Sequence, residues 1–397
     1  MKSFSLVVEV LFFIGVFFVS IFGVLWFFQD NPVLSPITSS TTFQFLTHLS
    51  PPATNKKIVY GFLPYWNFGQ VTLQPELTNI AYFSLSIDGN GNIVQTQNGG
   101  VDEGYHDLQS EDLLNILNTA AQQHTKPEIV LSMMDNDQIS HFLLSSDAQS
   151  KVIKSLDAVL LGYPFQGVNI DIEYTGPVTQ NLQDDYTNFI QLLRNHLQQH
   201  YKNIDLSVDI LASASSDRGI WDLQNLAKQV DYIVVMAYDF HRPSSIMAGP
   251  VAPLFGGQKL WDSDVTQHLR DLLLLVPKQK LLLGIPFYGY EWQTTSRNPQ
   301  AQTFPNTGEM ASEETIQQIL SQKNELSVQE GWSDDALSPY LSYLKDGQIH
   351  MIYYENSRSL SYKLDLVNQL DLGGIAIWAL GYEKNSRELW DVVQHKL

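Results

Sequence analysis

Cysteine is absent from all 397 residues of the chain. Disulfide bonds, thiolate metal sites and a cysteine nucleophile are therefore excluded. Basic residues are also scarce, because 23 Lys and Arg stand against 42 Asp and Glu, and the formal net charge is −19 at neutral pH. Nucleic-acid binding needs a basic face, and the sequence has no run of Lys and Arg. We expect no nucleic acid as a partner, and no motif in the sequence calls for a metal or a cofactor.

Charge is missing from one long N-terminal stretch. Residues 11–28, LFFIGVFFVSIFGVLWFF, carry none, and about 20 apolar helical residues span a bilayer. A cleaved signal peptide is the alternative, but QDNPVLSP follows without a small-residue cleavage site. We expect an uncleaved, single-pass transmembrane anchor at 1–28, a Pro-, Ser- and Thr-rich linker at 29–55, and a catalytic domain at 56–397 outside the cell.

The remaining chain alternates between strand-like and helix-like segments. Apolar, strand-like runs lie at 57–66, 77–87, 128–134, 167–173, 204–211, 230–238, 280–288 and 373–380. Amphipathic stretches such as 110–124, 148–162 and 181–201 separate them. This alternation predicts an α/β fold in which eight parallel strands close into a (β/α)8 TIM barrel. An open doubly wound sheet is the alternative, but no glycine-rich phosphate loop follows the first strand.

The connection between the seventh and eighth strands is too long for a single helix. Residues of about 293–356 contain a helix-like stretch at 312–322 and two strand-like runs, SPYLSYL and IHMIYYE. The two runs flank KDGQ (345–348), which is a good hairpin turn. We predict a small α+β insertion at one wall of the barrel mouth.

The strand GVNIDIE (167–173) places three polar side chains on one face. Because side chains alternate along a strand, Asn169, Asp171 and Glu173 point into the barrel while the Val and Ile residues between them face the helices. Glu173 comes last, at the end of the strand where catalytic residues of such barrels lie. Burial and like charge would raise the pKa of one acid, so that it can donate a proton near neutral pH. Interior salt bridges are the alternative, but the strands carry no Lys or Arg beyond their first residues.

The same segment, QGVNIDIE, is similar to D-G-x-D-x-D-x-E, the signature of glycoside hydrolase family 18, which comprises the chitinases and their relatives. MAYD (236–239) resembles the family's Met-x-Tyr-Asp segment after the sixth strand, and IAIWALG (375–381) resembles the eighth strand, whose Trp forms the floor of the sugar site. In LSMMDND only the Ser matches the family's Ser-x-Gly-Gly segment. The resemblance covers about 57–397. With GFLPYW and YDFH included, it is closest to the bacterial spore-cortex and cell-wall-lytic subgroup.

Two signature positions differ from the family pattern. Gln166 replaces the first acid and Asn169 replaces the second, which in the family supports the third. Asn169 can still hydrogen-bond to Asp171, and the decisive acid, Glu173, is present. These departures leave the pH optimum open.

The resemblance implies retaining hydrolysis in which the acetamido group of the substrate is the nucleophile. By analogy with the family, Glu173 is the general acid and base, Asp171 orients the acetamide, and Tyr238 hydrogen-bonds to its oxygen. The implied substrate-binding residues are Trp378, Asp239, Asn169, Tyr65, Tyr288 and Trp292. The last three are aromatic residues that follow the first and seventh strands, where packing in the core is an equal alternative to stacking on sugars.

The expected function is hydrolysis of β-1,4-linked glycans that contain N-acetylglucosamine, either peptidoglycan or chitin-type oligomers, at the cell surface. The alternative is a catalytically silent, lectin-like surface protein, which the departures at Gln166 and Asn169 favour. The expected partners are the N-acetylated glycan polymer and, through the N-terminal helix, the cell membrane. The chain is expected to act as a monomer.

Overall fold

The computed structural model describes residues 56–97, 99–216 and 219–397. The expected transmembrane anchor and linker, at 1–28 and 29–55, lie outside these residues. Among the described helices, none combines the length and apolar character that crossing a bilayer requires.

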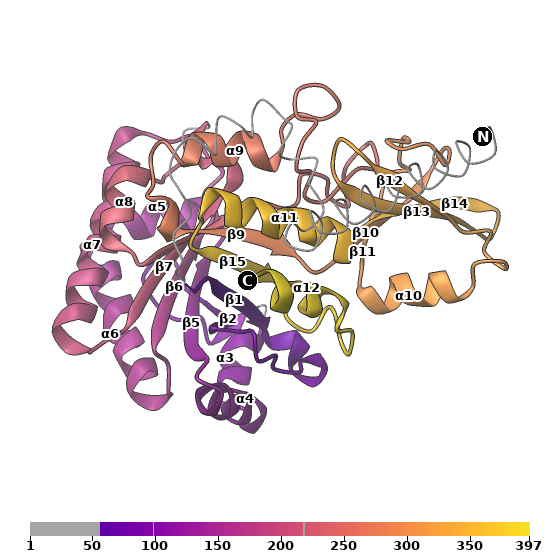
Figure 1. The fold of residues 1–397 in the computed structure, drawn as a ribbon. Helices are drawn as coiled ribbons and strands as arrows, with labels where there is room; N and C mark the ends of the chain where they lie inside the picture. Colours follow the sequence, from indigo (N-terminus) through magenta and orange to yellow (C-terminus); the bar gives the residue numbers. More distant parts are fainter. Residues whose placement is uncertain (1–55, 98, 217–218) are drawn as a thin grey trace, which may run out of the picture. The chain divides into compact units, whose positions relative to one another are not determined.

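Eight parallel strands close into a barrel (Figure 1). They are β1 (Ile58–Pro64), β2 (Asn79–Ser86), β5 (Lys126–Met133), β6 (Gly167–Ile172), β7 (Asp205–Leu211), β8 (Tyr232–Met236), β9 (Leu281–Pro286) and β15 (Gly374–Trp378). Around the barrel the order is β1-β15-β9-β8-β7-β6-β5-β2. Every predicted strand segment therefore contributes one barrel strand, and the predicted TIM barrel is confirmed.

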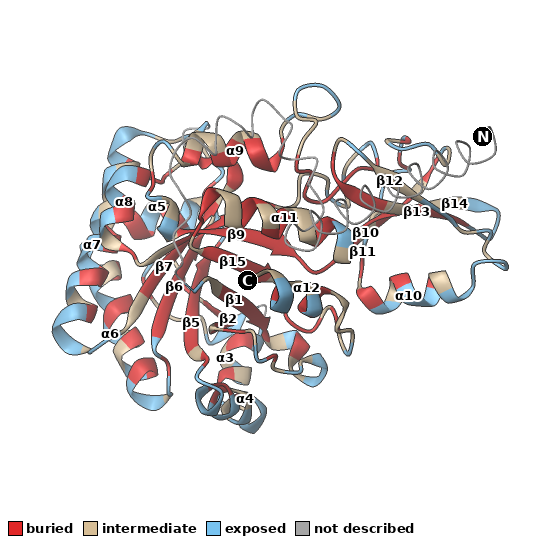
Figure 2. Cartoon of the chain, viewed as in Figure 1, coloured by how far each residue is buried: buried red, intermediate tan, exposed pale blue. Residues whose placement is uncertain are grey.

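Helices cover the outside of this barrel, and its strands are buried (Figure 2). The helices are α3 (Glu103–Leu108), α4 (Glu111–Gln122), α5 (Asn136–Leu144), α6 (Ser146–Gly162), α7 (Gln180–His200), α8 (Leu223–Gln229), α9 (Val265–Leu272), α11 (Ser357–Leu370) and α12 (Glu388–Lys396). Short 3-10 helices lie at η2 (Tyr65–Gln70), η3 (Ala212–Ser215) and η4 (Lys278–Lys280), and a minimal hairpin at β3 (Thr96–Gln97) and β4 (Gly100–Val101).

Helix α7 illustrates why these segments are helical. Thr179 precedes it, and the Thr179 hydroxyl accepts a hydrogen bond from the backbone N–H of Leu182 at 3.3 Å, which caps the first turn. Tyr186, Phe189 and Leu193 then recur at helical spacing and are buried. The helix therefore packs its apolar side inward and leaves its polar side in water.

The insertion after β9 contains more strands than predicted. It is an antiparallel sheet in the order β11-β10-β14-β13-β12. The strands are β10 (Gly289–Thr294), β11 (Glu309–Ala311), β12 (Gln329–Ser333), β13 (Ser338–Lys345) and β14 (Gln348–Tyr353), with helix α10 (Glu313–Ser321) packed against them. The predicted hairpin turn is confirmed, because Lys345 pairs with Gln348 and the two residues between them, Asp346 and Gly347, have φ values of 53° and 75°. The sequence predicted only two of these strands.

A polar cluster occupies the barrel interior beneath the strand ends. Glu128 of β5 is fully buried and accepts hydrogen bonds from the Tyr60 hydroxyl at 2.8 Å and from the Asn79 side-chain amide at 2.5 Å. Burial raises the pKa of Glu128 to about 7, against the opposing effect of these two hydrogen bonds. The Glu128 carboxyl is therefore protonated in the folded protein over a pH range where it would be ionised in the unfolded chain.

We predict that Glu128 makes stability depend on pH. Since its pKa is raised from 4.5 to about 7, its contribution is fully present below 4.5 and is lost as the pH rises toward 7. The free energy of unfolding should fall across this window by about 3 kcal/mol more in the wild type than in Glu128→Gln. Denaturant unfolding at a series of pH values measures the difference. If the free energy of unfolding changed with pH in parallel for the wild type and Glu128→Gln, the assignment would be contradicted. Glu111→Gln, at an exposed position, is the control.

Candidate active site

Strand β6 delivers its acids to the open end of the barrel, as the alternation predicted. Val168, Ile170 and Ile172 are fully buried on the helix-facing side, and Asp171 is only 3% exposed on the other. Glu173 follows the strand and is partly exposed, with its backbone N–H donating to the Met133 carbonyl at 3.0 Å. Backbone pairing to β5 thus extends to the residue that carries the candidate general acid.

A cavity of about 330 Å³ opens over these acids. Its walls come from the ends of several strands and from the insertion, and include Asp171, Glu173, Asp209, Tyr238, Asp239, Tyr288, Tyr290, Met310, Trp378 and Tyr382. Six of the residues selected from the sequence are thus brought together at one place: Glu173, Asp171, Tyr238, Asp239, Tyr288 and Trp378.

Asp171 and Glu173 lie in the β6 segment without an ion pair to any described residue. Across 56–97, 99–216 and 219–397, neither Asp171 nor Glu173 forms an ion pair, so the interior salt bridge that was the alternative interpretation is not present in this part of the chain. Burial raises the pKa of Asp171, and the neighbouring Asp209 and Glu173 raise it further. Burial also raises the pKa of Glu173, while Arg242 opposes this rise and Asp239 adds to it. The site therefore holds protons that ordinary carboxyl groups would lose.

Asp239 is held in place by the residues around it. The Tyr288 hydroxyl donates to Asp239 Oδ1 at 2.5 Å and the Tyr290 hydroxyl donates to the same oxygen at 2.9 Å. Arg242 Nε donates to the Asp239 backbone carbonyl at 3.2 Å. Asp239 has a φ of 62°, a left-handed conformation that Asp tolerates better than most residues. Its carboxylate is therefore fixed at the cavity wall with one oxygen already satisfied.

Tyr238 and Trp378 supply a hydrogen-bond donor and a flat apolar surface. Burial and the nearby acids raise the pKa of Tyr238, so its hydroxyl keeps its proton and can donate it in a hydrogen bond. The Trp378 ring packs edge-on against Phe83, with ring centroids 4.6 Å apart, and against Phe62 at 5.7 Å. These contacts fix the indole at the end of β15, where it remains partly exposed to the cavity.

Trp292 is a correction to the sequence prediction. It lies within β10 rather than on a loop after the seventh strand, and it is fully buried with Ala248, Met351 and Tyr353. Its indole N–H donates to the Arg242 carbonyl at 3.1 Å. No face of this ring is left for a sugar, and its role is to pack the insertion. Of the two interpretations given for Trp292, packing in the core is the one that the structure shows.

Tyr65 and Asn169 also lie away from the cavity walls. Tyr65 begins η2 and packs edge-on against Trp66, with ring centroids 4.8 Å apart. Asn169 is fully buried below Asp171, and its side-chain amide donates to Ser207 Oγ at 3.0 Å and to Asp209 Oδ1 at 2.7 Å. The expected hydrogen bond from Asn169 to Asp171 is therefore replaced by bonds to the next strand.

Asp209 was missed in the sequence, although a signal for it was present. It lies on β7, where Ser207 and Asp209 alternate with buried Leu206, Val208 and Ile210 as the polar residues of β6 do. The same alternation therefore marks two adjacent strands. Met310 was missed for another reason, because it lies on β11, a strand of the insertion that the sequence did not predict.

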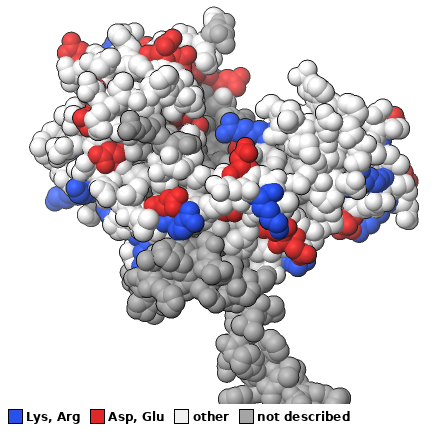
Figure 3. All heavy atoms as spheres, turned by 90° about the horizontal axis from the view of Figure 1, so that it is seen from above, with Lys and Arg blue, Asp and Glu red and all other residues white. Residues whose placement is uncertain are grey.

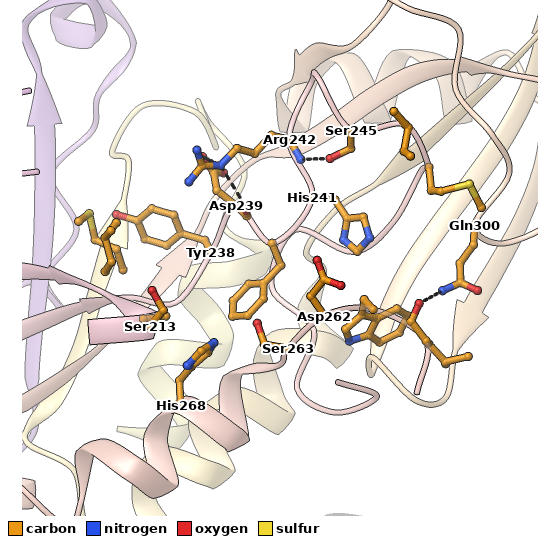
Figure 4. Close-up of a pocket in the computed structure, with 18 residues that line it drawn as sticks. Ser213, Tyr238, Asp239, His241, Arg242, Ser245, Asp262, Ser263, His268 and Gln300 are labelled. Carbon is orange, nitrogen blue, oxygen red and sulfur yellow. Dashed lines mark hydrogen bonds and ion pairs between the residues drawn. The ribbon is translucent and has the colours of Figure 1, made fainter. Parts of the chain in front are cut away.

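A second, larger cavity of about 630 Å³ adjoins the first and shares Met236, Tyr238 and Asp239 with it (Figure 4). The Tyr238 hydroxyl points away from His241 (Figure 4). His241 Nδ1 donates to the Pro250 carbonyl at 2.9 Å, and burial lowers the pKa of His241, which favours its neutral form. The cavity over the acids therefore adjoins a larger one, and the two have Met236, Tyr238 and Asp239 as common walls.

The surface around the cleft has few features that suggest other ligands. On the face seen in Figure 3, Lys and Arg are scattered singly among acidic side chains, and the described residues form no continuous basic patch there. Within the described residues, no group of three or more His, Asp or Glu is arranged to hold a metal ion.

The sequence matches the model of "Glycosyl hydrolases family 18" over residues 39–383. The chain belongs to this family. The segment QGVNIDIE lies within this match, and the resemblance to the spore-cortex and wall-lytic subgroup is confirmed by its relatives. The chain is 23% identical over 324 residues to the cortical fragment-lytic enzyme of Bacillus anthracis, across 78% of this chain and 66% of that protein.

Solved structures share the fold of this family 18 chain. The Group IV chitinase of Ostrinia furnacalis in complex with allosamidin aligns with a TM-score of 0.73 at 20% identity, covering 86% of this chain and 97% of that one. The spore cortex-lytic enzyme SleL of Bacillus cereus aligns with a TM-score of 0.68 at 19% identity, covering 86% and 74%. The matches span just under two thirds of the length of the first bacterial relatives, at 64 to 66%.

Proposed function

We propose that this protein hydrolyses β-1,4-linked glycans that contain N-acetylglucosamine, with retention of configuration and with the acetamide of the substrate as nucleophile. The proposal rests on one observation above all. Glu173, Asp171, Tyr238 and Trp378 share one open cavity in which two uncompensated acids face a donor hydroxyl and a flat indole. Membership of family 18 supports the same chemistry.

The proposed reaction assigns Glu173 both proton transfers. Glu173 donates its proton to the glycosidic oxygen as the bond from that oxygen to the anomeric carbon breaks. The acetamido oxygen attacks the same carbon and closes an oxazolinium ring, so no protein nucleophile is needed. The Glu173 carboxylate then takes a proton from water. That water attacks the anomeric carbon, opens the ring and restores the acetamide.

Asp171, Tyr238 and Trp378 prepare the substrate for this attack. Asp171 accepts a hydrogen bond from the acetamido N–H and stabilises the positive charge that develops as the ring closes. The Tyr238 hydroxyl donates to the acetamido oxygen and directs it toward the anomeric carbon. The Trp378 ring supports the apolar face of the sugar, while the fixed Asp239 carboxylate offers its second oxygen as a hydrogen-bond acceptor.

Peptidoglycan is the first proposed substrate, and chitin-type oligomers are the second. The names of the relatives support both, since one is a cortical fragment-lytic enzyme and another a chitinase. The adjoining cavity supports binding of a polymer rather than a single sugar. A silent, lectin-like protein remains the alternative, because Gln166 and Asn169 depart from the family signature.

We predict that Glu173→Gln lowers kcat by about 10²- to 10⁴-fold, because the amide cannot donate the proton that the leaving oxygen needs. Affinity for oligosaccharides should change little, since the side chain keeps its shape. Release of reducing ends from N-acetylglucosamine oligomers and from purified peptidoglycan measures the rate. Mass spectrometry of the products shows which glycan is cut and whether cleavage is internal or terminal.

The exposed Glu325→Gln is the matched control for Glu173→Gln, and it should retain full activity. Wild-type protein that binds oligomers but cleaves none, with Glu173→Gln binding equally well, would contradict the hydrolase and favour the lectin-like alternative.

The proposed place of action is the outer face of the cell membrane. Its support is the uncharged run at 11–28. We predict that the full chain sediments with membranes and resists an alkaline wash, whereas a chain lacking 1–28 stays in the soluble fraction. Full-length protein that is extracted by the wash would contradict a transmembrane anchor.

A further inference from the structure

Asn169 leaves the site one acid short of the family signature. The signature has an acid at this position, and that acid supports the third one, which is Asp171 here. The Asn169 amide cannot titrate, and its hydrogen bonds go to Ser207 and Asp209 on the neighbouring strand rather than to Asp171. Asp171 therefore lacks the neighbouring acid that the signature places one layer below it.

Strand register brings Asp209 beside Asp171. β6 and β7 run parallel, with Asn169 paired to Ser207 and Ile170 paired to Val208. One step further along, Asp171 and Asp209 both point inward, since side chains alternate. Each is 3% exposed, and both line the cavity of about 330 Å³. The third carboxyl of the site therefore comes from β7.

The two carboxyl groups have different hydrogen bonds. Asp209 Oδ1 accepts the Asn169 amide at 2.7 Å, and a donated hydrogen bond favours the ionised form of a carboxyl. Asp171 Oδ1 is buried and has no hydrogen-bond partner among the described residues. Burial raises the pKa of both carboxyl groups, and only Asp209 has a hydrogen bond, from Asn169, that lowers its pKa. Because adjacent carboxyl groups in a buried site resist ionising together, Asp209 ionises before Asp171 and the proton stays on Asp171.

Among the described residues, no cation acts on Asp209 itself, and the nearest one named in the site, Arg242, acts on Glu173. The titratable groups that face Asp209 are Asp171 and Glu173 of the β6 segment, Glu128 of β5, Tyr60 of β1, Tyr186 of α7 and Tyr238 after β8. All of them are acids or phenols. Asp209 can therefore hold its neighbours in their protonated forms by charge alone.

We propose that Asp209 is a positioning residue that replaces the acid missing at position 169, and that its charge keeps the catalytic proton on the Asp171–Glu173 pair. Asn169 acts as the fixed donor that keeps Asp209 ionised. Asp209 touches neither the leaving oxygen nor the acetamide in this scheme. This inference rests on the proposed glycoside hydrolysis and adds the control of its pH dependence.

The direct test is the pH profile of Asp209→Asn. Without the charge at 209, the Asp171–Glu173 pair binds its proton less tightly. The alkaline limb of the kcat profile should therefore move to lower pH by about one unit. At a fixed pH on that limb, kcat should fall by about tenfold, which is the change that one pH unit produces there, with KM changed less than twofold. A purely structural role would lower stability or raise KM and leave the limb where it is.

The exchange variant Asn169→Asp with Asp209→Asn provides the second test. It keeps one acid and one amide but swaps their strands, which restores the second acid of the family signature. We expect the alkaline limb to return to within a few tenths of a unit of the wild type. If Asp209→Asn does not fold, the exchange variant decides alone: a wild-type profile supports the proposal, and a folded variant with the shifted limb overturns it.

Asp205→Asn is the control on the same strand. Asp205 begins β7 and pairs with Lys126, away from the cavity, so its profile should match the wild type. An active wild type whose alkaline limb is unmoved by Asp209→Asn would overturn this inference and leave the proposed hydrolysis intact. A wild-type protein that cleaves no glycan would contradict both the proposed hydrolysis and this inference.

Discussion

The structure depends on a cluster of acids at one end of the barrel that has no ion-pair partner among the described residues. Burial raises the pKa of Asp171, Asp209 and Glu173, and Glu173 raises the pKa of the other two further. Burying a charge without a partner is costly, and such groups hold protons instead. A protein that needed only stability would fill this space with apolar side chains. The arrangement is useful where a proton must be given and taken back at neutral pH.

Two features of the barrel make this arrangement possible, the alternation of side chains along each strand and the closure of the sheet. Alternation along β6 and β7 sends polar residues inward and apolar residues toward the helices. Closure of the sheet brings β8, β9 and β15 to the same opening, where Tyr238, Tyr288 and Trp378 complete the walls. The insertion adds Tyr290, which helps to fix Asp239. The outward face of these strands thus packs against the helices, and the inward face carries the polar residues of the site.

The sequence predicted what depends on local pattern and missed what depends on contacts between segments. Alternation in one strand was enough to place Asp171 and Glu173 at the barrel opening. The sequence could not decide between core packing and sugar stacking for Trp292, because its strand joins a sheet of five strands, of which the sequence revealed two. The partner of Asn169 is Asp209, a contact between strands 40 residues apart in the chain. This hydrogen bond can be recognised only once the register between β6 and β7 is known.

The central claim is that this acid cluster retains a proton at neutral pH. Infrared difference spectroscopy of the free protein, comparing the wild type with Asp171→Asn, detects the carbonyl band of protonated carboxylic acids directly. We expect the spectrum of the wild type minus that of the variant to contain this band at neutral pH, because the contribution of Glu128 is common to both proteins and cancels. A difference spectrum that contains only bands of ionised carboxylate would contradict the account.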